Sequence, residues 1–219
     1  MQLKIIILEI IFSMFSAMAN STLHNSSDES LLLWYDNDIT KKEGITLAEN
    51  QLIGTIKSYG SGAMTVSFHL NITDIELGWG SILHIGNSNS QRQPAFWLRP
   101  NETELHSAYG STTNTWELFT DTPPLIANRW HHIVMIDEGD EAKLYVNNKL
   151  LQTIDASLSP TSSPGNKNVW AGNPWYTPAK ASIDDIRIYN RAVTLKELSE
   201  TPTKVLEPSS LTIFSLGII

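Results

Sequence analysis

The sequence predicts an all-β fold of the sandwich or barrel type. Short apolar segments follow one another from Leu31 to Tyr189, and clusters of Gly, Pro, Asn and Asp separate them at near-regular spacing. No long 3.6-residue apolar pattern occurs after the first 19 residues, so long amphipathic helices are not expected. Together these observations indicate antiparallel strands in a sandwich or barrel.

The apolar segments define the expected strands, and each has four to seven residues, a length that suits a strand. A short helical turn is expected where Val193, Leu195 and Leu198 follow the last strand and a threonine. In chain order the expected strands are Leu31–Tyr35, Leu52–Ile56, Met64–Leu70, Ser81–Ile85, Ala95–Leu98, Thr115–Phe119, Trp130–Ile136, Ala142–Val146, Leu150–Ile154, Asn168–Ala171 and Ile183–Tyr189.

The stretch from Trp130 to Ile154 predicts a three-stranded meander. Glu138-Gly139-Asp140 separates its first two strands, and Asn147-Asn148 separates the last two. Asparagine tolerates the positive φ that a tight hairpin needs. Leu144 and Val146 alternate with polar positions, which predicts one face for the core.

Size and composition favour one packed domain, from residue 31 to residue 200. The chain has 219 residues, 41% of them hydrophobic, and its net charge is −8. It has no basic run, which argues against nucleic acid as a partner. It has no cysteine, which excludes disulfides, thiolate metal sites and cysteine nucleophiles.

The N-terminus predicts export. Residues 1–19 have a lysine near the start, an apolar run and the small-residue pattern Ala17-Met18-Ala19, as in a secretory signal peptide cleaved after Ala19. An uncleaved membrane anchor is the alternative. Residues 20–30 are rich in Asn, Ser, Asp and Glu and are expected to form a flexible leader.

Five segments then resemble one known family. They are TVSFHL from Thr65, RWHHIV from Arg129, AKLYVNNKLL from Ala142, VWAGNPWYTPA from Val169 and IDDIRIYNRAVTLKEL from Ile183. In this order they resemble the laminin-G-like domains of the concanavalin A-like lectin/glucanase superfamily, over roughly Leu31 to Leu198. The resemblance implies a two-sheet antiparallel jelly-roll sandwich, in a form common in bacterial exported proteins.

The tail, residues 201–219, is expected to be a linker with a partial sorting signal. VLEPSSL, which starts at Val205, resembles the PEP-CTERM signal of Gram-negative exported proteins. Leu206 replaces the first proline, and the apolar run that follows is shorter than the roughly 20 residues needed to span a bilayer. The resemblance implies an extracellular or cell-surface location.

Asp184 and Asp185 are adjacent carboxylates on the last expected strand. In a regular strand Asp184 shares a face with Ile186, and Asp185 shares the other face with Arg187. One interpretation is that Asp185 pairs with Arg187 while Asp184 accepts backbone N–H groups. The alternative follows from the resemblance, since family members often bind Ca²⁺, and it makes Asp184, with Asp36 or Asp38, a ligand of a structural calcium ion.

Motifs of catalysis are weak in this sequence. Glucanases of the superfamily carry Glu-x-Asp-x-x-Glu on one strand, and this chain has no such run. The acidic stretch from Asp137 to Glu141 contains Gly139 and is expected to be a solvated turn. His131 and His132 are neighbours on a strand and should face opposite sides, so they are not expected to form one site. No catalytic residue is therefore assigned.

Aromatic residues in the loops indicate a sugar-binding surface. The candidates are Trp170, Trp175 and Tyr176 in one segment and Trp79 in another. Aromatic faces stack on sugar rings, although tryptophan in a sandwich also packs in cores. The expected function is a non-catalytic module that binds carbohydrate or an extracellular matrix component. Contact with a membrane is expected only through the signal peptide or the sorting segment. A divergent glycoside hydrolase or lyase and a purely structural surface protein are the alternatives.

Overall fold

The computed structural model describes residues 22–23, 28–36, 44–57, 62–110, 116–119, 124–156 and 165–200. The predicted signal peptide, part of the predicted leader and the tail from residue 201 lie outside these ranges. Within the described ranges, no helix combines the length and the apolar character needed to cross a membrane.

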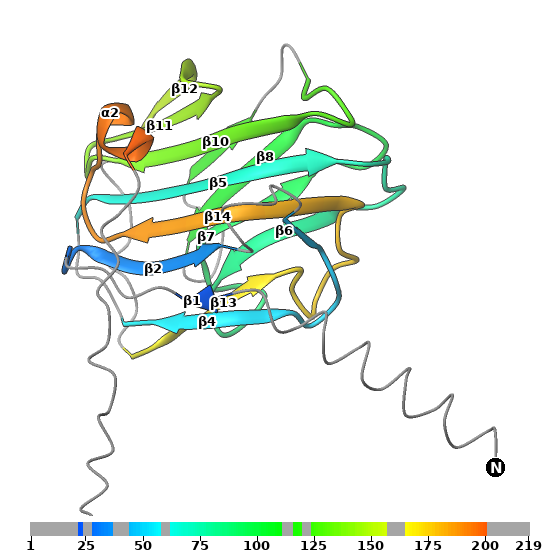
Figure 1. Ribbon diagram of the computed structural model, residues 1–219, viewed down its shortest axis with the longest axis horizontal. Coiled ribbons are helices and arrows are strands. Elements are labelled where there is room, and N and C mark those ends of the chain that lie inside the picture. The colour runs from blue at the N-terminus through cyan, green and yellow to red at the C-terminus, as the bar shows by residue number, and fades with distance from the viewer. Residues whose placement is uncertain are drawn as a thin grey trace, which may run out of the picture.

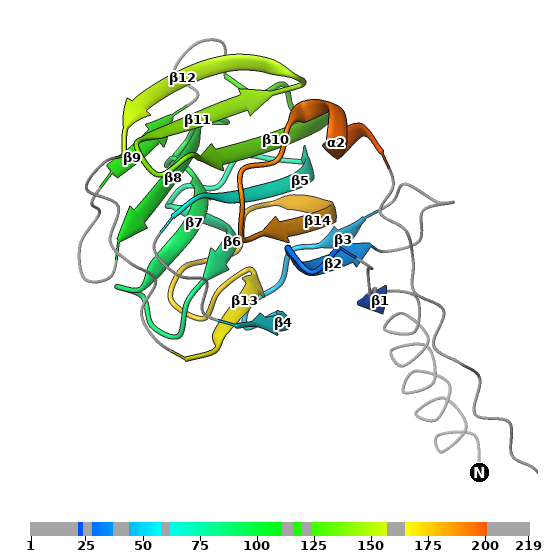
Figure 2. The ribbon, with the colours of Figure 1, turned by 90° about the vertical axis from the view of Figure 1, so that its left-hand side faces the viewer.

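The chain folds into two antiparallel sheets that pack face to face, as the sequence predicted (Figures 1 and 2). The larger sheet has the order β1-β2-β14-β5-β10-β11-β12, and β3 also pairs with β14. Its strands are β1 (Thr22–Leu23), β2 (Leu31–Asp36), β3 (Ile45–Thr46), β5 (Met64–Ile72), β10 (Trp130–Asp137), β11 (Glu141–Val146), β12 (Lys149–Asp155) and β14 (Ala181–Tyr189).

The smaller sheet lies behind the larger one in Figure 1 and has the order β4-β13-β6-β7-β8-β9. The first and last strands of the domain, β2 and β14, are neighbours in the larger sheet, as expected for this kind of sandwich. The strands of the smaller sheet are β4 (Leu52–Ile56), β6 (Gly80–Ile85), β7 (Arg92–Leu98), β8 (Leu105–Gly110), β9 (Trp116–Phe119) and β13 (Lys167–Ala171).

The main core fills the space between the two sheets. Period-two alternation directs one side of each strand inward, so that Phe68 of β5 meets Phe96 of β7 edge to face, with ring centroids 5.1 Å apart. Burial of each such side chain contributes roughly 1.5–3 kcal/mol to stability. The apolar alternation of the sequence therefore specifies which face of each sheet is inside.

The predicted meander is confirmed. β10, β11 and β12 pair in sequence, and Asn147 and Asn148 adopt φ values of 51° and 65° in the tight turn between β11 and β12. Leu144 and Val146 belong to the core, as their alternation predicted. All eleven expected strands are present, whereas β1, β3 and β8 were not predicted.

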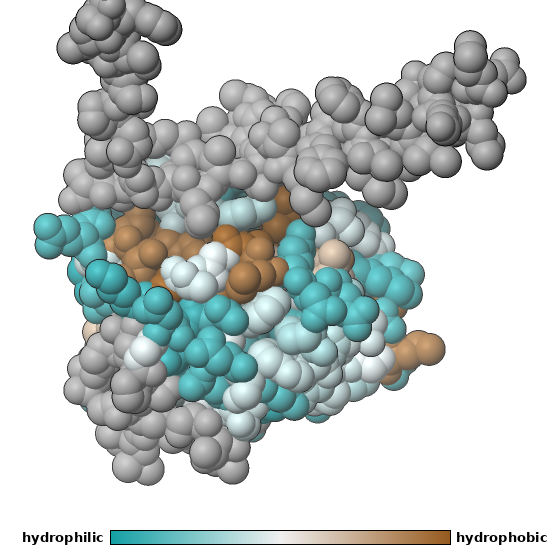
Figure 3. Space-filling view, turned by 90° about the horizontal axis from the view of Figure 1, so that it is seen from below, coloured by the Kyte–Doolittle hydropathy of each residue, from teal (hydrophilic) through white to brown (hydrophobic). Residues whose placement is uncertain are grey.

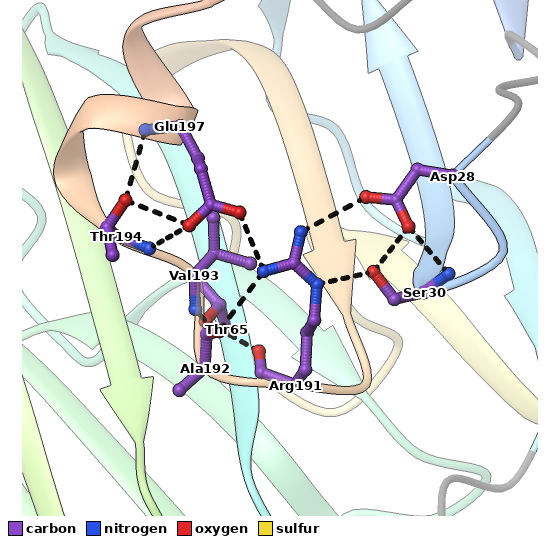
Figure 4. Close-up of polar contacts among 8 residues, drawn as sticks. All are labelled: Asp28, Ser30, Thr65, Arg191, Ala192, Val193, Thr194 and Glu197. Atoms are coloured by element: carbon purple, nitrogen blue, oxygen red, sulfur yellow. Dashed lines mark hydrogen bonds and ion pairs between the residues drawn. The ribbon is translucent and has the colours of Figure 1, made fainter.

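The predicted helical turn is α2 (Leu195–Ser199), and it packs on the outer face of the larger sheet. Thr194 caps it, since its hydroxyl accepts from the N–H of Glu197 and the Glu197 carboxylate accepts from the N–H of Thr194. The Arg191 guanidinium forms ion pairs with the carboxylates of Glu197, at 2.8 Å, and Asp28, at 3.3 Å (Figure 4). Its Nε also donates to the Ser30 hydroxyl at 2.8 Å. These contacts join residues 28–30 to the C-terminal part of the domain.

The prediction that Asp184 and Asp185 point to opposite faces was wrong. A β-bulge interrupts the pairing of β14 with β5 between Asp184 and Arg187, and Asp185 has a φ of 44°. The extra residue shifts the alternation by one position, so Ile183 and Ile186 both enter the core. Asp184 and Asp185 therefore both lie on the outer face of the larger sheet.

An apolar area lies on the underside of the sandwich, on the side where β4 forms the edge of the smaller sheet (Figure 3). Leu52 of β4 is 50% exposed.

Candidate functional site

The outer face of the smaller sheet carries a second, aromatic cluster. Phe96 and Leu98 of β7 point into the core, so Trp97 between them points outward. The same alternation turns His106 of β8 outward, and Phe119 of β9 with it. A row of rings therefore covers the face of the sheet that is opposite to the core.

A pocket of about 390 Å³ opens on this face. Its described lining consists of five aromatic or imidazole rings, two arginines and one glutamate, a composition typical of sites for small polar ligands. The lining residues are Trp79, Arg92, Trp97, Arg99, His106, Glu117, Phe119 and Tyr176.

The loop after β13 folds over the sheet and supplies Tyr176. Gly172 begins this loop with a φ of 85°, a left-handed conformation that favours glycine. The side-chain oxygen of Asn173 then accepts from the N–H groups of Trp175 at 2.9 Å and Tyr176 at 3.0 Å. This turn fixes both aromatic side chains against the outer face.

A second loop brings Trp79 to the same place. The N–H of Ser81 donates to the carbonyl of Thr177 at 2.8 Å, and the N–H of Thr73 donates to the carbonyl of Lys180 at 2.8 Å. These bonds place the segment before β6 beside the loop after β13. Trp79 is 37% exposed and lies against His106.

Two of the four aromatic residues predicted to bind sugar, Trp79 and Tyr176, line the pocket. Trp175 lies beside the pocket, and its ring centroid is 4.9 Å from that of the buried His84. The ring centroids of Trp170 and Trp175 are 6.2 Å apart. The Trp170 indole donates to the Gly86 carbonyl at 3.1 Å. The structure thus brings the four together in one aromatic cluster, with two of them at the pocket itself.

The two arginines lie over aromatic rings of the pocket. The Arg92 guanidinium lies 4.9 Å from the centre of the Trp97 ring, and one of its nitrogens donates to the Tyr176 hydroxyl at 3.3 Å. Arg99 lies 5.9 Å from the Phe119 ring and binds both oxygens of Glu104, at 3.0 and 3.1 Å. The charge of Arg99 is therefore offset by a carboxylate next to the pocket.

His106 and Glu117 form the central polar contact. The Nε2 atom of His106 lies 3.0 Å from Oε1 of Glu117. Burial lowers the pKa of His106, and the neighbouring carboxylate of Glu117 offsets part of that effect. His106 is therefore neutral at pH 7.

Most of the pocket was not predicted from the sequence. Arg92, Arg99, His106, Glu117 and Phe119 were not candidates, and neither was Trp97. A signal for Trp97 existed in AFWL, residues 95–98, because an unbroken apolar run indicates a strand that is buried on both faces. The polar segment around His106 gave no comparable strand signal.

His131 and His132 face opposite sides, as predicted. His131 is buried and contacts the backbone of Ile126, whereas the ring of His132 stacks on that of His69 at 4.7 Å on the outer face of the larger sheet. The Ser67 hydroxyl lies 2.8 Å from Nε2 of His132. In the predicted acidic turn, Glu138 and Glu141 bind Lys143 at 2.6 and 3.3 Å.

The predicted calcium ligands are only partly described. Asp36 ends β2 and is 4% exposed, Asp184 lies on the bulge of β14, and Asp38 is outside the described residues. The β2–β14 register aligns Ile186 with Tyr35, so Asp36 follows next to Asp185 rather than Asp184. Within the described ranges, no group of three or more His, Asp or Glu side chains could hold a metal ion. Calcium takes six to eight oxygens, so these carboxylates would need further carbonyl or water ligands to hold it.

Residues 41–199 match a laminin-G-type family model whose description is concanavalin A-like lectin/glucanases superfamily. No curated protein sequence matches the chain significantly. Solved structures with a similar fold include the receptor binding domain of botulinum neurotoxin C/D mosaic serotype, which is 14% identical with a TM-score of 0.53, over 82% of this chain and 50% of that one.

Two further structures share the fold. The ligand binding domain of botulinum neurotoxin serotype D, in complex with N-acetylneuraminic acid, is 14% identical with a TM-score of 0.52, over 84% of this chain and 51% of that one. A heptameric SAP-like pentraxin from Limulus polyphemus is also 14% identical, with a TM-score of 0.50, over 68% of this chain and 76% of that one. The chain thus spans about half the length of the neurotoxin domains. At these identities the similarity shows the fold alone.

Proposed function

Since the chain belongs to the concanavalin A-like lectin/glucanases superfamily, we propose that it is a non-catalytic module that binds carbohydrate outside the cell, in attachment to a glycan or to a matrix component. The observation that carries this proposal is the aromatic pocket on the outer face of the smaller sheet. The complex of a protein of similar fold with N-acetylneuraminic acid supports it.

The chemistry of the pocket suits a sugar ring. The partly exposed faces of Trp79 and Tyr176 can stack on the C–H face of a pyranose, while the polar lining can bond to hydroxyl groups. The volume of about 390 Å³ lies in the usual range of small-ligand sites, so the pocket suits a small sugar rather than a long stretch of polysaccharide.

The alternative of a glycoside hydrolase or lyase is less well supported by this pocket. Glycosidases use two carboxylates about 5 to 9.5 Å apart, on either side of the scissile bond. Among the described lining residues Glu117 is the one carboxylate, and it is bound to His106. The proposal therefore assigns Glu117 to ligand contact and not to acid–base catalysis.

The extracellular location rests on the sequence. The predicted signal peptide, residues 1–19, and the PEP-CTERM-like segment within residues 201–219 both lie outside the described residues. Expression in a Gram-negative host followed by N-terminal sequencing of the exported protein tests this part. Export with cleavage after Ala19 is the expected result, and a protein that stays in the cytoplasm contradicts it.

A glycan array tests the binding function, with the full chain and two variants. Trp79→Ala removes a partly exposed ring of the pocket, and Leu150→Ala removes an exposed apolar side chain from β12 on the other sheet. The expected result is binding to a defined set of glycans that Trp79→Ala weakens by about tenfold, about 1.4 kcal/mol, and Leu150→Ala leaves unchanged. Absence of binding to any glycan overturns the proposed function and supports the purely structural alternative. Cleavage of a glycan by the protein, detected as a new reducing end, supports the hydrolase alternative.

A further inference from the structure

The two most buried rings of the pocket each contain a nitrogen atom without a partner. Trp97 is 2% exposed and His106 is 5% exposed. Nε1 of Trp97 and Nδ1 of His106 are shielded from solvent and have no hydrogen-bond partner among the described residues. Buried polar atoms in proteins are nearly always paired, so two exceptions at one pocket call for an explanation.

The hydrogen-bond network defines what each nitrogen offers. A carboxylate only accepts, so Nε2 of His106 carries the hydrogen that is donated to Glu117. Because His106 is neutral, its Nδ1 is a lone-pair acceptor. The indole Nε1 of Trp97 is only a donor. The pocket thus contains one unused donor and one unused acceptor, on rings whose centres are 5.6 Å apart.

A hydroxyl group meets both requirements with one atom, because its oxygen accepts and its hydrogen donates. A carboxylate cannot donate to Nδ1 of His106, and an ammonium group cannot accept from Nε1 of Trp97. A second carboxylate next to Glu117 would also bring two negative charges close together.

The geometry points to an uncharged sugar as the ligand, with one hydroxyl bonded to Nε1 of Trp97 and to Nδ1 of His106. This inference rests on the proposed function and specifies its ligand as a neutral pyranose rather than an acidic one. Arg99 does not argue for an acidic sugar, because Glu104 already binds it. Both nitrogens are shielded from solvent, so a neighbouring ring must move before a ligand can reach them. Trp79 is the ring that would move, because it is partly exposed and lies against His106.

Ring-preserving variants test this inference. Trp97→Phe and His106→Phe each keep an aromatic ring. Trp97→Phe removes Nε1, whereas His106→Phe removes Nδ1 together with Nε2 and its bond to Glu117. Each variant is expected to weaken binding of the neutral sugar by roughly tenfold. Trp97→Phe removes part of a buried ring but breaks no hydrogen bond within the protein, so any fall in its thermal midpoint of unfolding comes from lost packing alone.

Trp170→Phe is the matched control. It makes the same chemical change in the same cluster, but it breaks the bond from the indole to the Gly86 carbonyl. It is expected to lower the thermal midpoint and to leave affinity unchanged. The contrast with Trp97→Phe separates a ligand contact from a role in stability alone.

Calorimetric titration of the full chain and these variants uses D-glucose, D-galactose and D-mannose, the uronic acid of each and N-acetylneuraminic acid. The expected result is that a neutral hexose binds more tightly than its uronic acid. Tighter binding of an acidic sugar, or wild-type affinity in Trp97→Phe, overturns the inference. If Trp79→Ala still weakens that binding by about tenfold, the proposed function survives, whereas failure of every sugar to bind removes both.

Discussion

Asp185 and Arg187, two positions apart on β14, form a two-pronged ion pair. Nε of Arg187 lies 2.7 Å from Oδ1 of Asp185, and Nη2 lies 2.8 Å from Oδ2. Both side chains lie on the outer face of the larger sheet, where the bulge also places Asp184. The remaining nitrogen of Arg187 donates to the carbonyls of Leu198 at 3.1 Å and Glu200 at 2.9 Å, so the pair also attaches the end of α2 to the sheet.

Removal of Asp185 is expected to destabilise the domain strongly. The Arg187 side chain is 8% exposed, so Asp185→Ala leaves a buried guanidinium without its carboxylate. The expected loss is about 3 kcal/mol of unfolding free energy, measured by urea denaturation. Asp74→Ala breaks the exposed pair with Lys180, where Asp74 is 68% exposed, and should leave the unfolding free energy nearly unchanged. Equal losses in the two variants contradict the assigned role of Asp185.

The ion pair also shows where the sequence was informative and where it was not. The pairing of Asp185 with Arg187 was one of the predicted interpretations and is confirmed. The face of Asp184 was predicted wrongly, because period-two alternation assumes a regular strand and a bulge leaves little trace in composition. Asp185 supplies the bulge conformation because a short polar side chain tolerates positive φ better than most.

Strand prediction succeeded where apolar alternation was strong and failed at β8. LHSAYG, residues 105–110, has Ser107 at an inward position and Ala108 at an outward one, so it lacks the apolar alternation of a half-buried strand. Its outer face nevertheless packs under the aromatic cluster, because β8 lies between β7 and β9. The pocket could therefore not be assembled from the sequence, since His106 and Trp97 become neighbours only through the order of the strands.

Gly172 is expected to control the loop that carries Tyr176. At its φ of 85° an added Cβ atom would clash with the carbonyl oxygen of Ala48, which belongs to the backbone and cannot rotate away as a side chain could. Gly172→Ala should therefore lower the unfolding free energy by roughly 3 kcal/mol and weaken binding at the pocket.

Gly78→Ala is the control for this prediction. An added Cβ at Gly78 meets nothing within 4 Å, so the thermal midpoint should stay close to that of the wild type. If the two alanine variants have the same thermal midpoint, the left-handed conformation of Gly172 is not required to form the loop.

Calcium remains a hypothesis that the family resemblance raised, and thermal unfolding of the full chain tests it. A metal that binds only the folded state must raise the midpoint by mass action, so added Ca²⁺ should raise it above the value in excess EDTA. Asp184→Ala should remove that rise, whereas Asp140→Ala, a change at a turn, should keep it. Equal midpoints in EDTA and in Ca²⁺ contradict the hypothesis and leave Asp184 as a carboxylate that accepts backbone N–H groups at the end of a strand.

Stability should fall as the pH drops from about 6.5 to about 4. Burial lowers the pKa of His84 to about 4, and burial together with the neighbouring His69 lowers the pKa of His132 to about 4. Near His132, Asp185 raises this pKa and Arg187 lowers it further. Between pH 4 and 6.5 the unfolded chain binds protons at these histidines and the folded chain does not, so stability rises with pH there.

His132→Gln tests this dependence, since an amide can still bond to the Ser67 hydroxyl. In the wild type, the contribution of His132 to the unfolding free energy should fall by at most about 2 kcal/mol between pH 7 and pH 5. His132→Gln should lose correspondingly less stability over that interval, as measured by urea denaturation at each pH. The carboxylates titrate in both proteins, so the difference between the two curves isolates His132. Superimposable curves would mean that the imidazole takes up its proton equally in the folded and unfolded chains.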